Sequence, residues 1–332
     1  MFAFPVLLGD IGGTNARFAL LHEPGGTVEL LPRALTAATP TPVEAIAAAL
    51  QSSSGQPPRS AIIAVATRVD SPAIRLTNAD WVIDAQAIGA AFGLERVVLV
   101  NDYTPVAASV VALSSARQEL VPLGTERAPG DGARVVLGPG TGLGVAALIP
   151  VEQRLVIVAT EAGHMEFGPM TEEETAFWPY LERLDGRVSA EVVLSGPGLL
   201  RLATALCRSR DAASPFAAPP DVFEAGREGR HPLAAEALRI FARFLGRFAG
   251  DLALTFEASG GVFIAGGIAP RMVDILTSGL FRDEFDRKAP HEAWARTVPA
   301  YVITHPEPAL QGLAVLAAEP ARFVFRFQEW RR

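Results

Sequence analysis

The chain has 332 residues, which is long for one hydrophobic core and predicts two domains or one large α/β unit. Hydrophobic residues make up 49% and charged residues 20%, a balance typical of a folded globular protein that excludes a mostly disordered chain. The formal net charge of −7 argues against non-specific nucleic-acid binding, which needs a basic face.

The rarest residue types restrict the function further. Lys288 is the only lysine, so the P-loop and protein-kinase signatures, which place a lysine on the phosphates, are excluded. A lone cysteine, Cys207, supplies neither a disulfide framework nor a cysteine zinc cluster, and we expect a buried, inert thiol. No signal peptide is expected at residues 2–8, and no run reaches the ~20 apolar residues of a membrane span. The expected location is therefore the cytoplasm.

Short apolar runs that end in Gly, Asn or Asp predict buried strands along the chain. Between several of them lie Ala-rich segments of helical character, such as residues 41–51. Strands that alternate with helices predict an α/β protein with buried sheets. The predicted strands lie at 4–10, 61–67, 96–102, 134–142 and 260–267.

The clearest helix is predicted at residues 233–259. Its apolar residues advance by three or four positions and form one stripe: Leu238, Phe241, Leu245, Phe248, Leu252 and Phe256. Gly260 and Gly261 are expected to supply its left-handed cap. Loops are predicted at 52–58, 126–133 and 211–221. The alternation of Phe323, Phe325 and Phe327 predicts a strand or an apolar edge at the tail.

Two glycine turns repeat one pattern in the two halves of the chain, "LLGDIGGTNARFAL" at 7–20 and "VVLGPGTGLGVAALI" at 135–149. Each has an apolar run, a glycine turn with a threonine, and a second apolar run, which is typical of a hairpin with an amide-lined turn. Either turn alone is equally compatible with an ordinary tight turn. Together they predict two surfaces that grip one polyphosphate from both sides.

A third glycine segment, "VFIAGGIAPR" at 262–271, follows the long helix. Gly266 and Gly267 would allow a flat group such as adenosine to approach the backbone closely. The alternative is a simple turn between a strand and a helix.

The ordered set "GDIGGTNAR", "LVNDYTPVA", "LGPGTGLG", "TEAGHMEFGP", "SAEVVLSGPGLL" and "VFIAGGI" resembles bacterial ATP-dependent glucokinases, from residue 6 to about 318. These belong to the actin/hexokinase/Hsp70-like superfamily. The resemblance implies a two-domain, duplicated actin-like ATPase (ribonuclease H-like) α/β fold with an interdomain active-site cleft. It implies a smaller domain at 1–113 plus about 304–332, and a larger one at 114–303. The related ROK sugar kinases carry a cysteine-rich zinc loop, which Cys207 alone cannot supply.

The resemblance also implies roles for individual residues. Asp102, after a buried strand, would be the general base for the sugar's 6-hydroxyl. Alternatively, Asn101 or Asp102 caps the next helix, although Thr104 and Pro105 already make a good helix start. The sugar-binding residues implied are Asn101, Asp102, Glu161, His164, Glu191 and Asn78.

Ordinary structural roles compete with several of these assignments. A lone histidine such as His164 is more often structural, and Glu191 alone is a first-turn helix acid. Glu166 is interpreted as a solvated or structural charge, and Trp81 as a core residue. Arg17 is as well explained by a structural role as by a phosphate clamp.

The ATP-binding residues implied are Gly9, Asp10, Ile11, Gly12, Gly13, Thr14, Asn15, Gly140, Thr141, Gly142, Gly266 and Gly267. Asp10 would place Mg²⁺, through water, beside the phosphates, because this ion takes oxygen ligands and keeps several waters.

The predicted function is transfer of a phosphoryl group from Mg-ATP to glucose, giving glucose 6-phosphate and ADP. The alternatives are a kinase of mannose, fructose or N-acetylglucosamine, and a sugar-sensing actin-like ATPase. The expected partner is a hexose, with no nucleic acid and no membrane. ADP or polyphosphate as donor stays open, as does the oligomeric state, although the family is often a homodimer.

Overall fold

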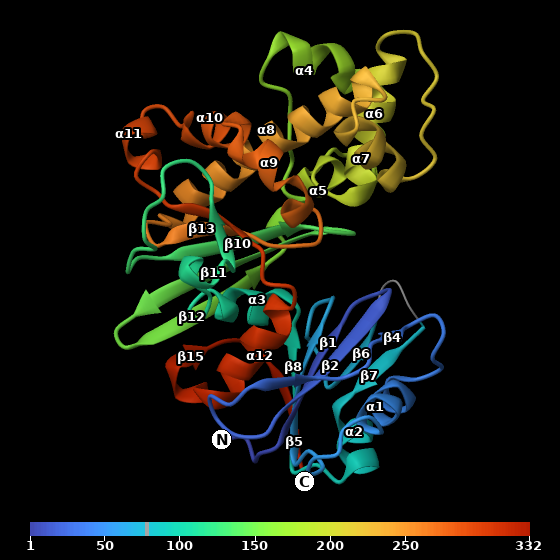
Figure 1. Cartoon of the computed structure of the whole chain (residues 1–332), viewed down its shortest axis with the longest axis vertical. Coiled ribbons are helices and arrows are strands. Elements are labelled where there is room, and N and C mark those ends of the chain that lie inside the picture. The colour runs from blue at the N-terminus through green and yellow to red at the C-terminus, as the bar shows by residue number, and fades with distance from the viewer. Residues whose placement is uncertain (77–79) are drawn as a thin grey trace. The chain divides into compact units, whose positions relative to one another are not determined.

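The computed structural model describes residues 1–76 and 80–332 of the chain, which divides into two units (Figure 1). Unit 1 comprises Met1–Ser114, Ala146–Ala159 and His305–Arg332. Unit 2 comprises Ser115–Val145 and Thr160–Thr304. Among the described residues, no helix is both long and apolar enough to cross a membrane.

The sheet of unit 1 has the order β16-β8-β5-β1-β2-β3, with β4 beside β2. Strands β1, β5 and β8 are parallel, and β2 and β16 are antiparallel to their neighbours. The three parallel strands are almost wholly buried, as expected for a sheet covered on both faces. The bounds are β1 (Val6–Ile11), β2 (Asn15–Leu21), β3 (Val28–Leu30), β4 (Ala34–Leu35), β5 (Ser60–Val65), β8 (Arg96–Asn101) and β16 (Gln328–Arg331).

The α-helices in the described part of unit 1 are α1 (Pro42–Leu50), α2 (Ala85–Phe92), α3 (Tyr103–Ser109) and α12 (Pro308–Ala318). Helices α3 and α12 touch closely, because a Cβ on Gly312 would lie 1.7 Å from the carbonyl oxygen of Pro105. A short hairpin, β6 (Ala73–Arg75) and β7 (Val82–Asp84), completes the unit. The predicted helix at 41–51 is confirmed as α1, with Thr41 as its N-cap.

The second sheet has the order β15-β12-β11-β10-β13-β14-β9. Its strands are β9 (Leu120–Pro122), β10 (Arg134–Pro139), β11 (Leu143–Val151), β12 (Arg154–Thr160), β13 (Gly261–Ile264), β14 (Ala300–Ile303) and β15 (Phe323–Val324). Residues 146–159 and β15 belong to unit 1, and the rest to unit 2. All five predicted strands are present, and each begins within two residues of its expected start.

Unit 2 is built around the long helix α8 (Pro232–Phe256), which packs on α6, α7 and α10. The predicted stripe is buried from Leu238 to Leu252 and only partly buried at Phe256. The other helices are α4 (Glu172–Phe177), α5 (Ala190–Val193), α6 (Gly196–Arg208), α7 (Pro219–Arg227), α9 (Val273–Thr277), α10 (Leu280–Asp286) and α11 (Glu292–Ala295).

Two sequence-based details at helix ends are wrong. The left-handed cap of α8 is Glu257, with φ 48°, and not Gly260 or Gly261, because the helix ends three residues earlier than predicted. The predicted loop at 211–221 is shortened by α7, which begins at Pro219. Proline at the first helical position favours that start, since its missing N–H has no partner there anyway.

The strand predicted over the alternating phenylalanines is present only in part, because β15 contains Phe323 whereas Phe325 and Phe327 lie between β15 and β16. Phe323 in β15 is buried, whereas Phe327 is 40% exposed. In β16 the Trp330 ring packs directly on Gly89 of α2. A Cβ added at Gly89 would lie 2.0 Å from that ring. The tail is thus the edge strand of the unit 1 sheet.

Candidate active site

The carboxyl ends of the parallel strands of unit 1 meet at one edge of the sheet. The register pairs Ile11 with Val65 and Val65 with Asn101, so the strands β1, β5 and β8 end level with one another. Asp10 lies one residue before the end of β1, and Asp102 directly follows β8. With one strand between them and ~4.8 Å per strand, the two backbones are about 10 Å apart across the sheet.

The first glycine turn joins β1 and β2 as an antiparallel hairpin, as predicted. The N–H of Gly12 donates to the carbonyl oxygen of Asn15 at 2.9 Å. Thr36 holds the turn from outside: its hydroxyl donates to the Gly13 carbonyl at 2.6 Å and its N–H to the Thr14 carbonyl at 3.1 Å. The N–H groups of Gly13 and Thr14 donate to no described residue. Two backbone donors are therefore available to an anion.

Two further predicted residues of this motif lie inside β1. Ile11 is fully buried, so only its backbone could reach a ligand. Gly9 packs against the side chain of Ile63, where an added Cβ would lie 3.3 Å from two of its carbons. The glycine at this position is thus explained by packing within the sheet.

Asp10 lies directly opposite Arg17 in the β1–β2 register and accepts a hydrogen bond from its Nη1 at 2.9 Å. Burial raises the pKa of Asp10 above its usual value of 3.8; Arg17 opposes this shift, and the carboxylate of Glu307 adds to it. Arg17 therefore has the structural role that the sequence left open, as the counter-ion of Asp10 in this structure.

Asn101 and Asp102, at the end of β8, make different hydrogen bonds. The Asn101 amide donates to the Thr67 carbonyl at 3.2 Å and accepts from the Tyr103 N–H at 2.9 Å. The Asp102 N–H donates to the Val65 carbonyl at 3.0 Å. Asp102 occupies the N-cap position of α3 without a side-chain cap hydrogen bond. The expected N-cap at Thr104 is wrong, because α3 begins one residue before it, at Tyr103.

The second glycine turn, between β10 and β11 in unit 2, has a similar interior. The N–H of Gly140 donates to the Gly142 carbonyl at 2.8 Å, and the Gly140 carbonyl accepts from the Gly196 N–H at 2.8 Å. Within the described chain, the N–H groups of Thr141 and Gly142 have no acceptor. This turn, like the first, presents two backbone donors.

Gly266 and Gly267 follow β13 and approach the end of β10. Gly266 has φ +81°, and a Cβ there would lie 2.4 Å from the Pro139 carbonyl oxygen. Gly267 would place a Cβ in open space, with no atom within 4 Å. The first glycine is thus required by the close approach of two strands, and the second leaves backbone uncovered.

The predicted sugar residues of unit 2 gather around Leu143, the residue after the second glycine turn. Glu191 in α5 accepts a hydrogen bond from the Leu143 N–H at 2.8 Å. Gly163 packs on the same residue, since a Cβ there would lie 2.2 Å from the Leu143 carbonyl oxygen. Glu161 and His164 flank Gly163 and are 60% and 59% exposed, with 3.9 Å between Oε2 and Nε2. Glu191 therefore contacts the residue after the turn directly, and Glu161 and His164 belong to the segment that packs on it through Gly163.

Four other sequence-based assignments concern Asn78, Trp81, Glu166 and Cys207. Asn78 lies outside the described residues. Trp81 is buried, as predicted, and its indole N–H donates to the Thr39 carbonyl. Glu166 is exposed and pairs with Arg187 at 3.3 Å, as expected of a solvated charge. The predicted buried state of Cys207 is confirmed, and burial raises the pKa of its thiol.

A magnesium ion requires oxygen ligands and retains several waters, so one protein carboxylate suffices when phosphates supply the rest. Among the described residues, no group of three or more His, Cys, Asp and Glu side chains could hold a metal. The donor set at the first glycine turn is the single carboxylate of Asp10. It fits an ion that arrives on the phosphates of a nucleotide.

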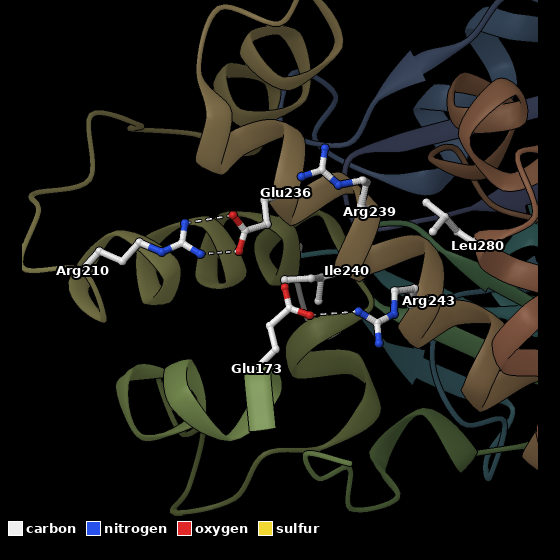
Figure 2. A pocket seen from close by; sticks show the side chains of 7 residues that line it. All are labelled: Glu173, Arg210, Glu236, Arg239, Ile240, Arg243 and Leu280. Atoms are coloured by element: carbon white, nitrogen blue, oxygen red, sulfur yellow. Dashed lines mark hydrogen bonds and ion pairs between the residues drawn. The ribbon is translucent and has the colours of Figure 1, made fainter. Parts of the chain in front are cut away.

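A surface pocket of about 240 Å³ lies in unit 2 (Figure 2). Four of its charged side chains pair with one another: Arg210 with Glu236 at 2.7 Å and Arg243 with Glu173 at 3.2 Å. The pocket contains no predicted site residue. It is lined by Glu173, Arg210, Glu236, Arg239, Ile240, Arg243 and Leu280.

Sequence analysis missed three residues that shape the site: Thr36, Gly196 and Glu307. Thr36 and Glu307 lie far along the chain from the turn they support, in segments with no chemical motif. Gly196 stands in the quoted "SAEVVLSGPGLL", but only the structure shows its bond to Gly140. One available signal was the hairpin itself, since a two-residue loop of Gly13 and Thr14, closed by Gly12 and Asn15, places Arg17 opposite Asp10.

Comparison with known proteins gives a consistent result. The sequence profile of the family described as Glucokinase matches residues 7–320. A protein of Brucella suis biovar 1 (strain 1330) named glucokinase is 44% identical over 322 residues, 97% of this chain and 93% of that protein.

Among solved structures, a glucokinase from an Antarctic psychrotroph superposes with a TM-score of 0.83 and 29% identity, covering 94% of this chain and 98% of its own. A ROK family glucokinase from Streptomyces griseus, in complex with glucose and AMPPNP, has a TM-score of 0.65 and 23% identity. It covers 95% of this chain and 99% of its own. This second likeness supports the actin-like ATPase fold alone. The family match, the identity and the coverage together show that this chain belongs to the glucokinase family of ATP-dependent phosphotransferases.

Proposed function

We propose that this chain transfers the γ-phosphoryl group of ATP to the 6-hydroxyl of glucose, with Asp102 as the general base. Family membership supports the reaction. The observation that carries the assignment of the base is the position of Asp102 directly after the buried strand β8, where the Val65 carbonyl holds its backbone N–H. A carboxylate at the carboxyl edge of a parallel sheet is suitably placed to meet a ligand.

In this mechanism Asp102 accepts the proton of the 6-hydroxyl as that oxygen attacks the γ-phosphorus. The bond from phosphorus to the bridging oxygen breaks, and ADP leaves with the electron pair. When bound, Mg²⁺ neutralises charge on the phosphate oxygens. Phosphoryl transfer needs little covalent chemistry from a protein, so alignment and charge stabilisation provide most of the rate.

The proposed nucleotide contacts are the backbone donors of the two glycine turns and the hydroxyls of Thr14 and Thr141. Four N–H groups without a described acceptor support this assignment, because successive backbone amides bind anions. Gly267 is proposed to lie under the adenosine, supported by the open space beside its Cα.

The proposed sugar contacts are Glu161, His164, Glu191 and Asn101. Exposure of Glu161 and His164 supports this role, since both side chains are free to meet hydroxyl groups. A site that satisfies many hydroxyls rejects analogues lacking them, because its own polar groups would be left unpaired. Glucose binding by the Streptomyces griseus relative is a parallel for this chain's proposed ligand.

The test of the proposal is Asp102→Asn, assayed by coupled ADP release with glucose, mannose, fructose and N-acetylglucosamine. We expect glucose to be the best acceptor and the variant to lose about three to four orders of magnitude in kcat with little change in sugar binding. Asp70→Asn, a change at an exposed carboxylate of unit 1, is the matched control. Near-normal turnover by Asp102→Asn would contradict the assignment of the base.

As part of the same proposal, the enzyme works in the cytoplasm as a homodimer. The cytoplasm supplies ATP and keeps a free thiol such as Cys207 reduced. Sedimentation equilibrium of the purified chain tests the dimer, and a monomer at all concentrations would refute it.

A further inference from the structure

Four charged residues of unit 1 form a continuous chain of contacts, which we call the Asp10 charge chain: Asp10, Arg17, Glu307 and Arg33. Arg17 donates to Asp10 through Nη1 at 2.9 Å, and its Nε lies 3.4 Å from Glu307 Oε2. Arg33 contacts the other oxygen of Glu307. Two cations and two anions alternate, so the Asp10 charge chain is neutral as a whole.

Glu307 is the buried member of the Asp10 charge chain. It is 7% exposed and stands directly before α12, which packs on β1 and β2 (Figure 1). Although it occupies the N-cap position of α12, its side chain makes no cap hydrogen bond. A buried carboxylate is retained only with partners, and its partners here are the two arginines.

Arg17 is shared unequally between its two carboxylates. Its Nη1 makes a hydrogen bond to Asp10, whereas its Nε is buried and has no hydrogen-bond partner among the described residues. That Nε faces Glu307 at 3.4 Å, slightly too far for a good hydrogen bond. A small movement of Arg17 would therefore exchange one carboxylate for the other.

We infer that Glu307 is a positioning residue that draws Arg17 away from Asp10 when Mg²⁺ binds with the nucleotide. The inference rests on the proposed role of Asp10. A divalent cation and a guanidinium repel each other at one carboxylate, so Arg17 needs a second anion within reach. Glu307 supplies that anion in a buried place that solvent screens weakly.

The expected sign follows from competition. In Glu307→Gln the charge that attracts Arg17 is lost, so Arg17 pairs with Asp10 alone and opposes Mg²⁺. In Arg33→Gln the Glu307 carboxylate loses its outer partner and attracts Arg17 more strongly, so Mg²⁺ binds more easily. The two substitutions affect residues that contact each other in the Asp10 charge chain, and they should shift the Mg²⁺ requirement in opposite directions.

The experiment measures binding of AMP-PNP by calorimetry as Mg²⁺ is varied, with no turnover involved. We expect Glu307→Gln to raise the half-saturating Mg²⁺ concentration about ten-fold, the effect of one hydrogen bond to a charged group. Arg33→Gln should lower it by about two- to three-fold. Glu307→Asp, which keeps the charge, should restore most of the wild-type value.

Glu329→Gln is the matched control, because Glu329 is likewise a carboxylate between two arginines of unit 1, Arg96 and Arg331. It should leave the Mg²⁺ requirement unchanged even if it lowers stability. Should Glu307→Gln fail to fold, the opposite shift in Arg33→Gln still tests the inference.

Asp10→Asn separates this inference from the proposed function. A raised Mg²⁺ requirement in Asp10→Asn with none in Glu307→Gln would overturn the inference and leave the metal role of Asp10 standing. No shift in either variant would overturn the metal role itself. In the background of Arg17→Gln, Glu307→Gln should add no further shift, and an undiminished shift there would refute action through Arg17.

Discussion

The two glycine turns present the same interior and differ in what holds them. Each is a hairpin turn with one internal backbone hydrogen bond and two N–H groups that no described residue accepts. The first is held by one residue, Thr36, whose side-chain hydroxyl and backbone N–H each donate to one of its carbonyls. The second is held by backbone and a carboxylate, through Gly196 and Glu191.

This difference teaches that an anion cradle depends on its carbonyls as much as on its amides. A turn presents its N–H groups outward only when its carbonyls are satisfied elsewhere. In unit 1 the hydroxyl and the N–H of Thr36 do this, and in unit 2 the N–H of Gly196, the first residue of α6, does. The repeated sequence pattern therefore predicts where the two glycine turns lie, whereas the residues that hold each turn differ between the two units.

The strongest way to break the second turn is Gly266→Ala. The added Cβ would meet the Pro139 carbonyl at 2.4 Å at a positive φ, so β10 and the turn after it must move. We expect a loss of about 3 kcal/mol in the free energy of unfolding, measured by urea denaturation. Gly267→Ala, with nothing within 4 Å of its Cβ, should leave stability nearly unchanged. Equal losses in the two variants would contradict the close approach.

Glu191→Ala removes the acceptor of the Leu143 N–H in the second turn. A charge-assisted hydrogen bond is lost, so we expect about 2 kcal/mol less stability and a raised KM for both glucose and ATP. Glu191→Gln retains an acceptor oxygen, so we expect it to restore the KM for ATP more fully than the KM for glucose. If both variants change only the KM for glucose, the carboxylate does not support the turn.

Thr36→Val tests the support of the first turn. Loss of the hydroxyl bond to the Gly13 carbonyl should cost about 1 kcal/mol and raise the KM for ATP a few-fold without changing that for glucose. Steady-state kinetics with each substrate varied in turn measures this. Thr36→Ser retains the hydroxyl and should behave as the wild type. A loss of stability and a rise in KM for ATP as large as those of Thr36→Val would argue against the hydrogen bond.

The smallest expected effect concerns pH and the edge of the unit 1 sheet next to β8. Burial opposes ionisation of Glu329, but hydrogen bonds and charge from Arg331 and Arg96 outweigh it and hold the pKa below 4.5. A lowered pKa in the folded state stabilises the fold above pH 4.5, and that stability is lost as pH falls through the folded-state pKa. Urea unfolding should therefore show a smaller loss for Glu329→Gln than for wild type over this interval. If the free energy of unfolding falls equally with pH in both proteins, Glu329 does not have the lowered pKa.

Much of the fold and of the candidate site was predictable because its signals are local. Buried parallel strands are continuous apolar runs, and the long helix repeats its apolar residues at helical spacing. The two glycine turns stand directly after such strands, so their hairpins could be predicted from the sequence. The resemblance then supplied roles for Asp102, Glu161, His164 and Glu191, which their local patterns alone leave ambiguous.

The supports of the site were not predictable, because each lies far along the chain from what it supports. Glu307 is 290 residues from Arg17, and nothing in its neighbourhood distinguishes it from an exposed glutamate before a proline. The cap of α8 was mispredicted for a related reason: local glycines favour a left-handed residue, but the packed end of the helix decides which residue adopts it.

The sequence by itself determined the strands, the long helix, the two amide-lined turns and, through its ordered motifs, the family. Apolar periodicity and glycine are properties of neighbouring residues, so they can be recognised without a fold. Only the tertiary structure decided which carbonyls are satisfied, which counter-ion Asp10 has, and that Glu191 holds the turn beside it. Those outcomes depend on burial and on distances between residues remote in sequence, where desolvation makes each hydrogen bond and charge partner matter.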